Sequence, residues 1–84
     1  MSLYTQSQQA IIAAERAQQA GDETRARQLF GDAAYLQAQF VESLPTDKAR
    51  TRSVYGLSVA TLYYRANAVD EAERWAHKTL SYLS

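Results

Sequence analysis

The sequence predicts an all-α protein of four antiparallel helices, and two observations carry that prediction. The 84 residues are rich in good helix formers such as alanine, glutamine, arginine and leucine, whereas glycine occurs three times and proline once. The main breaks fall at Gly21, Pro45 and Asn67, and apolar residues between them recur at helical spacings. Three breaks leave four helical stretches, which we expect to form one domain over residues 1–84.

The first helix hairpin is expected over about residues 5–44. Thr5 opens a capping-box pattern, and the helix that follows continues to about Ala20 before Gly21 ends it. The side chain of Asp22 can accept a hydrogen bond from the first turn of the next helix, where a carboxylate also meets the positive end of the helix dipole. We therefore expect Asp22 to cap the second helix.

The second helix has one apolar stripe with residues at spacings of three and four. The stripe consists of Ala26, Leu29, Phe30, Ala33, Phe40, Val41 and Leu44. Gly31 lies inside this helix, where glycine costs up to about 1 kcal/mol relative to alanine. We expect the helix to remain intact and another helix to approach closely at Gly31.

The second hairpin is expected over about residues 47–83. Pro45 disfavours helix at the preceding residue, and Thr46 or Asp47 can cap the third helix. Because the third helix is apolar around most of its circumference, we expect it to lie between the others. Its apolar residues are Val54, Tyr55, Leu57, Val59, Ala60, Leu62, Tyr63 and Tyr64.

The fourth helix is amphipathic and begins near Val69. Its polar residues fall on one side, so the apolar side should be buried. The residues expected to be buried are Val69, Ala72, Trp75 or Ala76, Thr79, Leu80 and Leu83.

Composition excludes several function classes. Nine basic and nine acidic residues give no net charge, so no long-range field attracts nucleic acid or an anionic membrane. The absence of cysteine excludes disulfides and thiolate chemistry. No apolar run is long enough for a signal peptide or a membrane span, and we expect a cytoplasmic protein.

Catalytic and metal-binding patterns are missing from the sequence. The one histidine, His77, lies between Arg74 and Lys78 on the side of the fourth helix that should face water. The Glu-x-x-His pairs of di-iron bundles do not occur. We expect neither enzymatic activity nor a cofactor.

An internal repeat relates the two hairpins. Ala26 and Ala72 lie 46 residues apart, and the residues around them correspond in kind. Each half is a helix, a tight turn at Gly21 or Asn67, and a second helix with a small residue in its first turns. Glycine and asparagine suit that turn because both tolerate left-handed dihedral angles.

These features resemble the tetratricopeptide repeat family. Gly21-Asp22 matches the family's turn, Ala26 and Ala33 match its small positions, and Phe30 matches its aromatic position. The second half fits less closely, through Ala60, Tyr63, Ala72 and Thr79. The period of 46 exceeds the usual ~34 residues because the second helix is longer. Such long second helices are also similar to three-helix microtubule-interacting-and-trafficking domains.

The tetratricopeptide resemblance implies that the first helix of each hairpin lines an inner face. That face would be formed by Ile11, Glu15, Gln18, Leu57, Thr61, Tyr64 and Arg65. Family members that grip a chaperone's terminal carboxylate use lysines and asparagines there, so a carboxylate clamp is not expected here. We expect a peptide or helix of a partner protein to bind in the groove between the first and third helices.

Two alternatives remain open at this stage. In one, Ile11, Leu57 and Tyr64 close the core of a compact four-helix unit. In the other, the protein is structural and self-associates, because two repeats are fewer than the three that solenoids usually need. The apolar residues that a second copy would cover are Leu3, Tyr4, Trp75, Tyr82 and Leu83.

Overall fold

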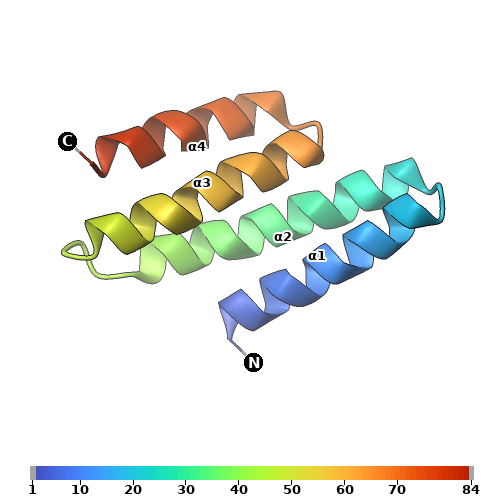
Figure 1. Cartoon of the computed structure of the whole chain (residues 1–84), viewed down its shortest axis with the longest axis horizontal. Helices are drawn as coiled ribbons and strands as arrows, with labels where there is room; N and C mark the ends of the chain where they lie inside the picture. The colour runs from blue at the N-terminus through green and yellow to red at the C-terminus, as the bar shows by residue number, and fades with distance from the viewer. Residues whose placement is uncertain (1, 84) are drawn as a thin grey trace.

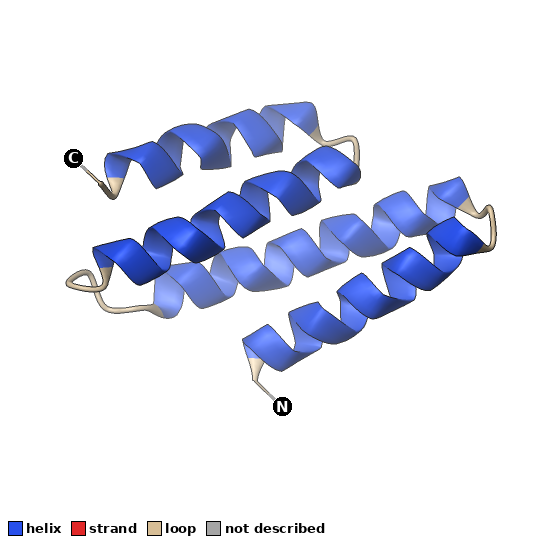
Figure 2. Ribbon diagram, viewed as in Figure 1, coloured by secondary structure: helices blue, strands red, loops and turns tan. Residues whose placement is uncertain are grey.

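The computed structural model describes residues 2–83 and confirms an all-α protein with four antiparallel helices (Figures 1 and 2). The helices are α1 (Leu3–Gln19), α2 (Glu23–Ser43), α3 (Ala49–Arg65) and α4 (Val69–Ser81). Among these residues, Cα atoms within 8 Å of each other join only consecutive helices. In Figures 1 and 2, α2 lies behind α1 and α3. The molecule is therefore flat, with extents of 41 × 29 × 14 Å.

The starts of α1 and α2 are each capped by a side chain. Ser2 Oγ accepts a hydrogen bond from the Thr5 N–H at 3.1 Å, so α1 begins two residues before the expected Thr5. Thr5 belongs to the first turn of the helix instead of capping it. Asp22 caps α2 as predicted, because its Oδ1 accepts from the Arg25 N–H at 3.2 Å.

The start of α3 differs from the prediction. The Lys48 N–H donates to the Pro45 carbonyl at 3.1 Å, and this turn delays the helix until Ala49. Lys48 occupies the cap position without a side-chain hydrogen bond, so neither Thr46 nor Asp47 caps the helix.

The two tight turns are equivalent in conformation and hydrogen bonding. Gly21 has φ of 80° and Asn67 has φ of 63°, the left-handed conformation predicted for both. Each turn pairs the same backbone groups at 2.9 to 3.1 Å: Asp22 to Ala17 and Gly21 to Gln18 in the first, Ala68 to Tyr63 and Asn67 to Tyr64 in the second. These residues correspond at the 46-residue offset, so the repeat is present at both turns.

The core consists of two clusters dominated by small side chains. One joins α1, α2 and α3 and consists of Ala14, Ala17, Ala26, Phe30, Ala33, Ala34 and Leu62. The other joins α2, α3 and α4 and consists of Ala38, Val41, Val59, Ala60 and Trp75. Ala26 is 4 % exposed and Ala72 is 7 % exposed, so both repeat positions are buried contact points.

Of the two helical glycines, Gly31 and Gly56, the one with the closer neighbour is Gly56, which the sequence analysis did not single out. A Cβ added there would lie 2.5 Å from Thr79 Oγ1 on α4. At Gly31, where a close approach was expected, an added Cβ would lie 3.7 Å from Ala66 Cβ, an ordinary contact. At Gly56, α3 and α4 therefore approach each other more closely than α2 and the end of α3 do at Gly31.

The expected burial of the fourth helix is wrong on one side. Val69 and Leu80 of α4 are exposed, as is Leu83 just after the helix, whereas Ala72, Trp75 and Thr79 are buried. Of the alternatives Trp75 and Ala76, Trp75 is the buried one. In α3, Val54, Leu57 and Tyr64 are exposed although this helix lies between α2 and α4. The physical reason is that none of the four described helices covers this side.

Candidate protein-interaction face

The seven residues predicted to line one groove are divided between several places, although Gln18, Tyr64 and Arg65 share one hollow. At one end, α1 and α3 are joined by a hydrogen bond from Arg65 Nη2 to Gln18 Oε1 at 3.3 Å. The Arg65 guanidinium also stacks 4.0 Å from the centroid of the Phe30 ring on α2. These contacts link the first three helices at the place where the groove was expected to be open.

The other end of α1 and α3 is closed by aromatic rings. Tyr4 lies 5.5 Å from both Phe40 and Tyr55, measured between ring centroids, and the last two rings are 5.1 Å apart. Between the two ends, Ile11 is half-buried and packs against the first core cluster, while Glu15 is exposed on α1. Ile11 therefore contributes to the core, which is the alternative left open for it.

The remaining predicted residues lie on the outer side of α3, beside α4. Thr61 and Tyr64 line a hollow of about 320 Å³ with Ala60 of the same helix. The opposite wall belongs to α4 and consists of Ala72, Glu73 and Ala76. Tyr64 also borders a second hollow of about 290 Å³ at the Gln18–Arg65 junction. The structure thus brings Thr61 and Tyr64 together with α4, and it also brings Tyr64 together with Gln18 of α1 at the second hollow.

The residues expected to serve self-association are mostly covered by this chain itself. Trp75 is 7 % exposed and packs in the second core cluster, so it is not available to a partner. Tyr82 is half-buried, with the Arg52 guanidinium 4.6 Å from its ring centroid. Leu3 and Tyr4 are also half-buried. Of this set, Leu83 remains exposed.

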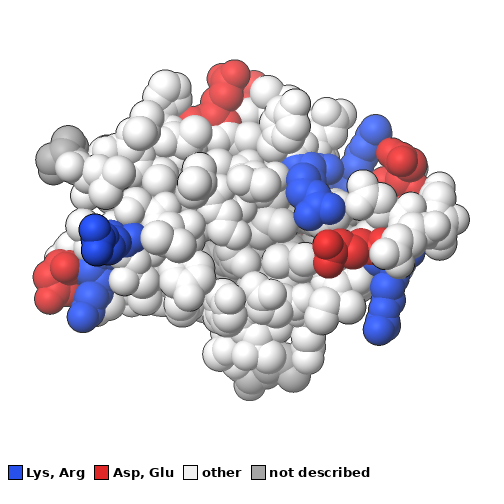
Figure 3. Space-filling model, viewed as in Figure 1, with Lys and Arg blue, Asp and Glu red and all other residues white. Residues whose placement is uncertain are grey.

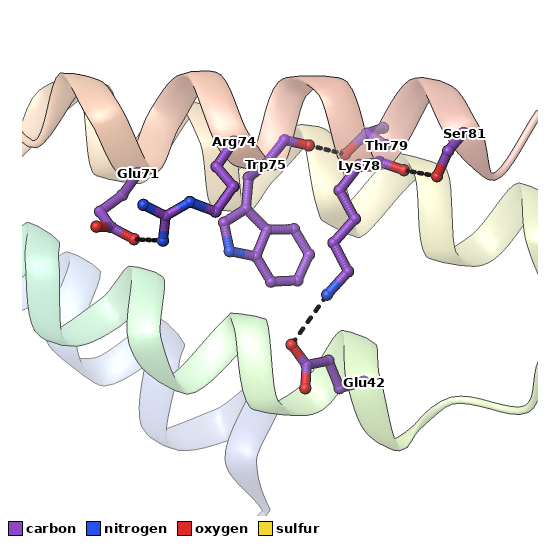
Figure 4. A network of polar contacts seen from close by, with 7 residues as sticks. All are labelled: Glu42, Glu71, Arg74, Trp75, Lys78, Thr79 and Ser81. Atoms are coloured by element: carbon purple, nitrogen blue, oxygen red, sulfur yellow. Dashed lines mark hydrogen bonds and ion pairs between the residues drawn. The ribbon is translucent and has the colours of Figure 1, made fainter.

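Charged side chains of α4 flank the buried indole of Trp75 (Figure 4). The Lys78 ammonium lies 4.6 Å from the indole centroid and 3.2 Å from Glu42 of α2. One turn earlier, Arg74 pairs with Glu71 at 3.0 Å. These exposed pairs contribute only a few tenths of a kcal/mol each, so they explain solubility on this side better than stability.

The surface with the most exposed apolar side chains is made by α3 and α4. We call it the α3–α4 face, and its large residues are Val54, Leu57, Tyr64, Val69, Leu80 and Leu83. These six residues are 45 to 69 % exposed, and their side chains are mostly apolar. Large apolar side chains that gather on one surface are typical of interaction sites.

The sequence contained a signal for this face in α4. Ala72, Trp75 and Thr79 form one helical stripe, and Val69, Ala76, Leu80 and Leu83 form a second stripe beside it. Two adjacent stripes are wider than the contact with a single neighbouring helix, although the pattern alone does not show which of them is covered.

The electrostatics of the molecule favour apolar recognition. Figure 3 shows an uncharged area across the middle of the face in view, with charged side chains at its left and right sides and at its top edge. The hollow between α3 and α4 has Glu73 as its one charged lining residue. Burial raises the pKa of the Tyr63 phenol on α3, and the nearby Glu71 carboxylate raises it further.

Residues 2–83 contain neither a metal-binding cluster nor a membrane-spanning helix. These residues contain no group of three or more acidic or histidine side chains able to hold a metal ion. In the same part of the chain, none of the four helices combines the length and apolar character needed to cross a bilayer.

Comparison of the chain with known protein families, curated proteins and solved structures found no match. The α3–α4 face is therefore compared with the equivalent positions of the α1–α2 hairpin in the same chain.

Proposed function

We propose that this chain is a non-catalytic protein–protein interaction module that accepts an apolar helical surface of another chain on its α3–α4 face. The observation that carries the proposal is a difference between positions 46 residues apart. Phe30, Ala34 and Gln37 of α2 are at most 2 % exposed. Their equivalents are Ala76 and Leu80 of α4 and Leu83 just after it, which are exposed and apolar.

This difference in exposure follows from the helices that cover each hairpin. α3 lies beside α4 as α1 lies beside α2, so the neighbour within each hairpin is the same. The α1–α2 hairpin has in addition the following helix, α3, whose Leu62 completes the first core cluster and whose Arg65 covers the Phe30 ring. Within residues 2–83, no helix covers the α3–α4 hairpin in the same way. Its open face therefore has the shape and chemistry of a place for one more helix.

The resemblance to tetratricopeptide repeats supports this choice of face. In a repeat array each hairpin covers the one before it, and a terminal hairpin without a polar outer surface needs a cover. Contacts between α1 and α3 disfavour the groove between these two helices. The hydrogen bond of Arg65 to Gln18 bridges one end of the groove, and the contact between the Tyr4 and Tyr55 rings bridges the other end. The proposed site consequently keeps Leu57, Thr61 and Tyr64 from the sequence prediction and replaces the α1 residues with α4 residues.

Site-specific photocrosslinking in the native cell tests this proposal. Leu80 would be replaced by a photoreactive phenylalanine analogue such as p-benzoylphenylalanine. Ile12, which is 49 % exposed on α1, would carry the same probe as the matched control. We expect discrete adducts with another polypeptide from position 80 and none of them from position 12. Adducts from position 12 alone, or the same adducts from both positions, would overturn the proposal.

A further inference from the structure

The hollow at the Gln18–Arg65 junction differs in chemistry from the α3–α4 face. It has a volume of about 290 Å³, and its walls come from α1, α2, α3, the second tight turn and the start of α4. Its polar lining residues are Gln18, Glu23, Arg27, Tyr64, Arg65 and Asn67. Because helices far apart in the chain meet here, this set of polar groups comes together only in the folded protein.

Arg65 is held in this hollow without an ion-pair partner. One face of its guanidinium stacks 4.0 Å from the centroid of the Phe30 ring, and Nη2 donates a hydrogen bond to Gln18 Oε1 at 3.3 Å. Within residues 2–83, no carboxylate pairs with this guanidinium, and only one of its N–H groups donates a hydrogen bond. The orientation of Arg65 is therefore fixed while most of its donors remain available to a ligand.

The other two charges of the hollow compensate each other. Arg27 lies 3.9 Å from Glu23, one turn earlier on α2, and both side chains are more than half exposed. Glu23 therefore has a cation on its own helix, and the lining keeps one net positive charge at Arg65. The Tyr64 hydroxyl and the Asn67 amide add neutral donors to the same lining.

This balance of charge and donors favours a singly charged oxyanion. The planar fork of a guanidinium matches the two oxygens of a carboxylate, which can accept two parallel hydrogen bonds from it. One carboxylate also carries the single negative charge that the lining leaves uncompensated.

The size and the apolar lining indicate that the carboxylate is attached to a carbon skeleton. The hollow has roughly ten times the volume that one water molecule occupies in the liquid, so a bare ion would leave most of it unfilled. Ala26, Phe30 and Val69 also line it and offer apolar contacts to such a skeleton.

We infer that the Gln18–Arg65 hollow binds a carboxylate on a short carbon skeleton, with Arg65 as the residue that holds its two oxygens. An acidic side chain of another protein and a free organic acid supply the same chemistry. The site is separate from the proposed function, because it shares only Tyr64 and Val69 with the α3–α4 face. It also differs from the chaperone clamp of the inner face, since α2 supplies part of its lining.

NMR titration of the full chain tests this inference. The signals to follow are the Arg65 Nε–H and the backbone amide of Asn67. N-acetylglutamate amide serves as the probe for an acidic side chain, and benzoate as the probe for a free organic acid. N-acetylglutamine amide has the shape of the first probe without its charge. We expect saturable shifts at millimolar concentrations of a carboxylate probe and none with the glutamine compound.

Substitutions then assign the binding to Arg65. Arg65→Gln should weaken it by at least about tenfold, and Arg65→Lys should weaken it nearly as much because lysine keeps the charge without the planar fork. Arg50→Gln, at the other end of α3 and outside the hollow, is the matched control and should change nothing. Glu23→Gln should strengthen binding several-fold, because it removes the one negative charge of the lining. Wild type and Glu23→Gln together keep the test valid even if the Arg65 variants lose their helical spectrum.

The possible outcomes separate the two sources of carboxylate from failure of the inference. Binding of N-acetylglutamate amide supports an acidic side chain as the ligand, and binding of benzoate alone supports a free acid. Absence of saturable shifts with both probes would overturn the inference. Equal shifts with sodium chloride at the same ionic strength, or undiminished binding in folded Arg65→Gln, would also overturn it. Because position 80 lies outside the hollow, the photocrosslinks expected there test the proposed function independently.

Discussion

Gly56 of α3 lies directly against the hydroxyl of Thr79 on α4, and this contact sets how closely the second hairpin packs. A Cβ at position 56 would lie 2.5 Å from Thr79 Oγ1 and 3.5 Å from the Tyr82 ring. The hydroxyl cannot turn away without loss, because it donates a hydrogen bond to the Trp75 carbonyl at 2.7 Å. The absence of a side chain at Gly56 is therefore a requirement of the α3–α4 interface.

The first prediction is that alanine has opposite effects at the two helical glycines. Gly56→Ala should lower the free energy of unfolding by about 1 to 3 kcal/mol through overpacking. Gly31→Ala should raise it by up to about 1 kcal/mol, since its new Cβ meets Ala66 at an ordinary 3.7 Å and alanine favours helix. Urea unfolding followed by circular dichroism measures both.

A double mutant isolates the contact with Thr79. Thr79→Ala removes the atom that an added Cβ would approach most closely, so Gly56→Ala should cost less in the Thr79→Ala background. An equal cost in both backgrounds would mean that Oγ1 does not limit the packing.

The second prediction concerns the left-handed turn residues. Gly21→Ala should destabilise the protein by about 1 kcal/mol because alanine has a Cβ penalty at positive φ. Gly21→Asn should cost less, since asparagine already occupies the equivalent turn at Asn67 with φ of 63°. Thermal unfolding midpoints compare the two variants, and equal losses would contradict this explanation of the turns.

The third prediction concerns the equivalent contact points of the repeat. Ala26→Leu and Ala72→Leu should each destabilise by about 1 to 3 kcal/mol, because both methyl groups are buried between helices. Ala76→Leu is the matched control on α4, and it should change stability little because Ala76 is exposed. Denaturant titration of the monomer gives the three values.

The fourth prediction concerns alkaline pH. The pKa of Tyr63 is raised above its ordinary value of 10.0 by burial and by Glu71, so the unfolded chain releases this proton first. Stability should therefore be unaffected by Tyr63 below pH 10 and should fall as pH rises from there toward the folded pKa. Tyr63→Phe should flatten that decline, measured as the change in unfolding midpoint between neutral pH and pH above 10. An identical decline in both proteins would contradict the role of Tyr63.

The fold was predictable from local signals, and the site was predictable only in part. Gly21, Asn67 and Asp22 act within one turn of the chain, and their roles follow from residue type alone. Helical periodicity also shows which side of α4 is apolar. It cannot show whether another element covers that side, which is why Leu80 and Leu83 were expected to be buried.

The bridge between Gln18 and Arg65 across the predicted groove could not be predicted for a similar physical reason. Position along a helix indicates that Gln18 and Arg65 are exposed and close to helix ends, but their hydrogen bond joins residues 47 apart in the chain. Such a pairing depends on the angle at which helices cross, and no local pattern contains that angle. Trp75 was placed at an open end for the same reason, whereas α2 covers it.

The flat arrangement of the helices has a consequence for how the chain folds. Since backbone proximity links only consecutive helices, each hairpin can form before distant parts of the chain meet, and the average separation of contacting residues is small. Topologies of this kind fold in microseconds to milliseconds. Such proteins also open from their termini inward. Amide protons of α4 should therefore exchange with deuterium faster than those of α2, because α2 lies between α1 and α3 in the first core cluster.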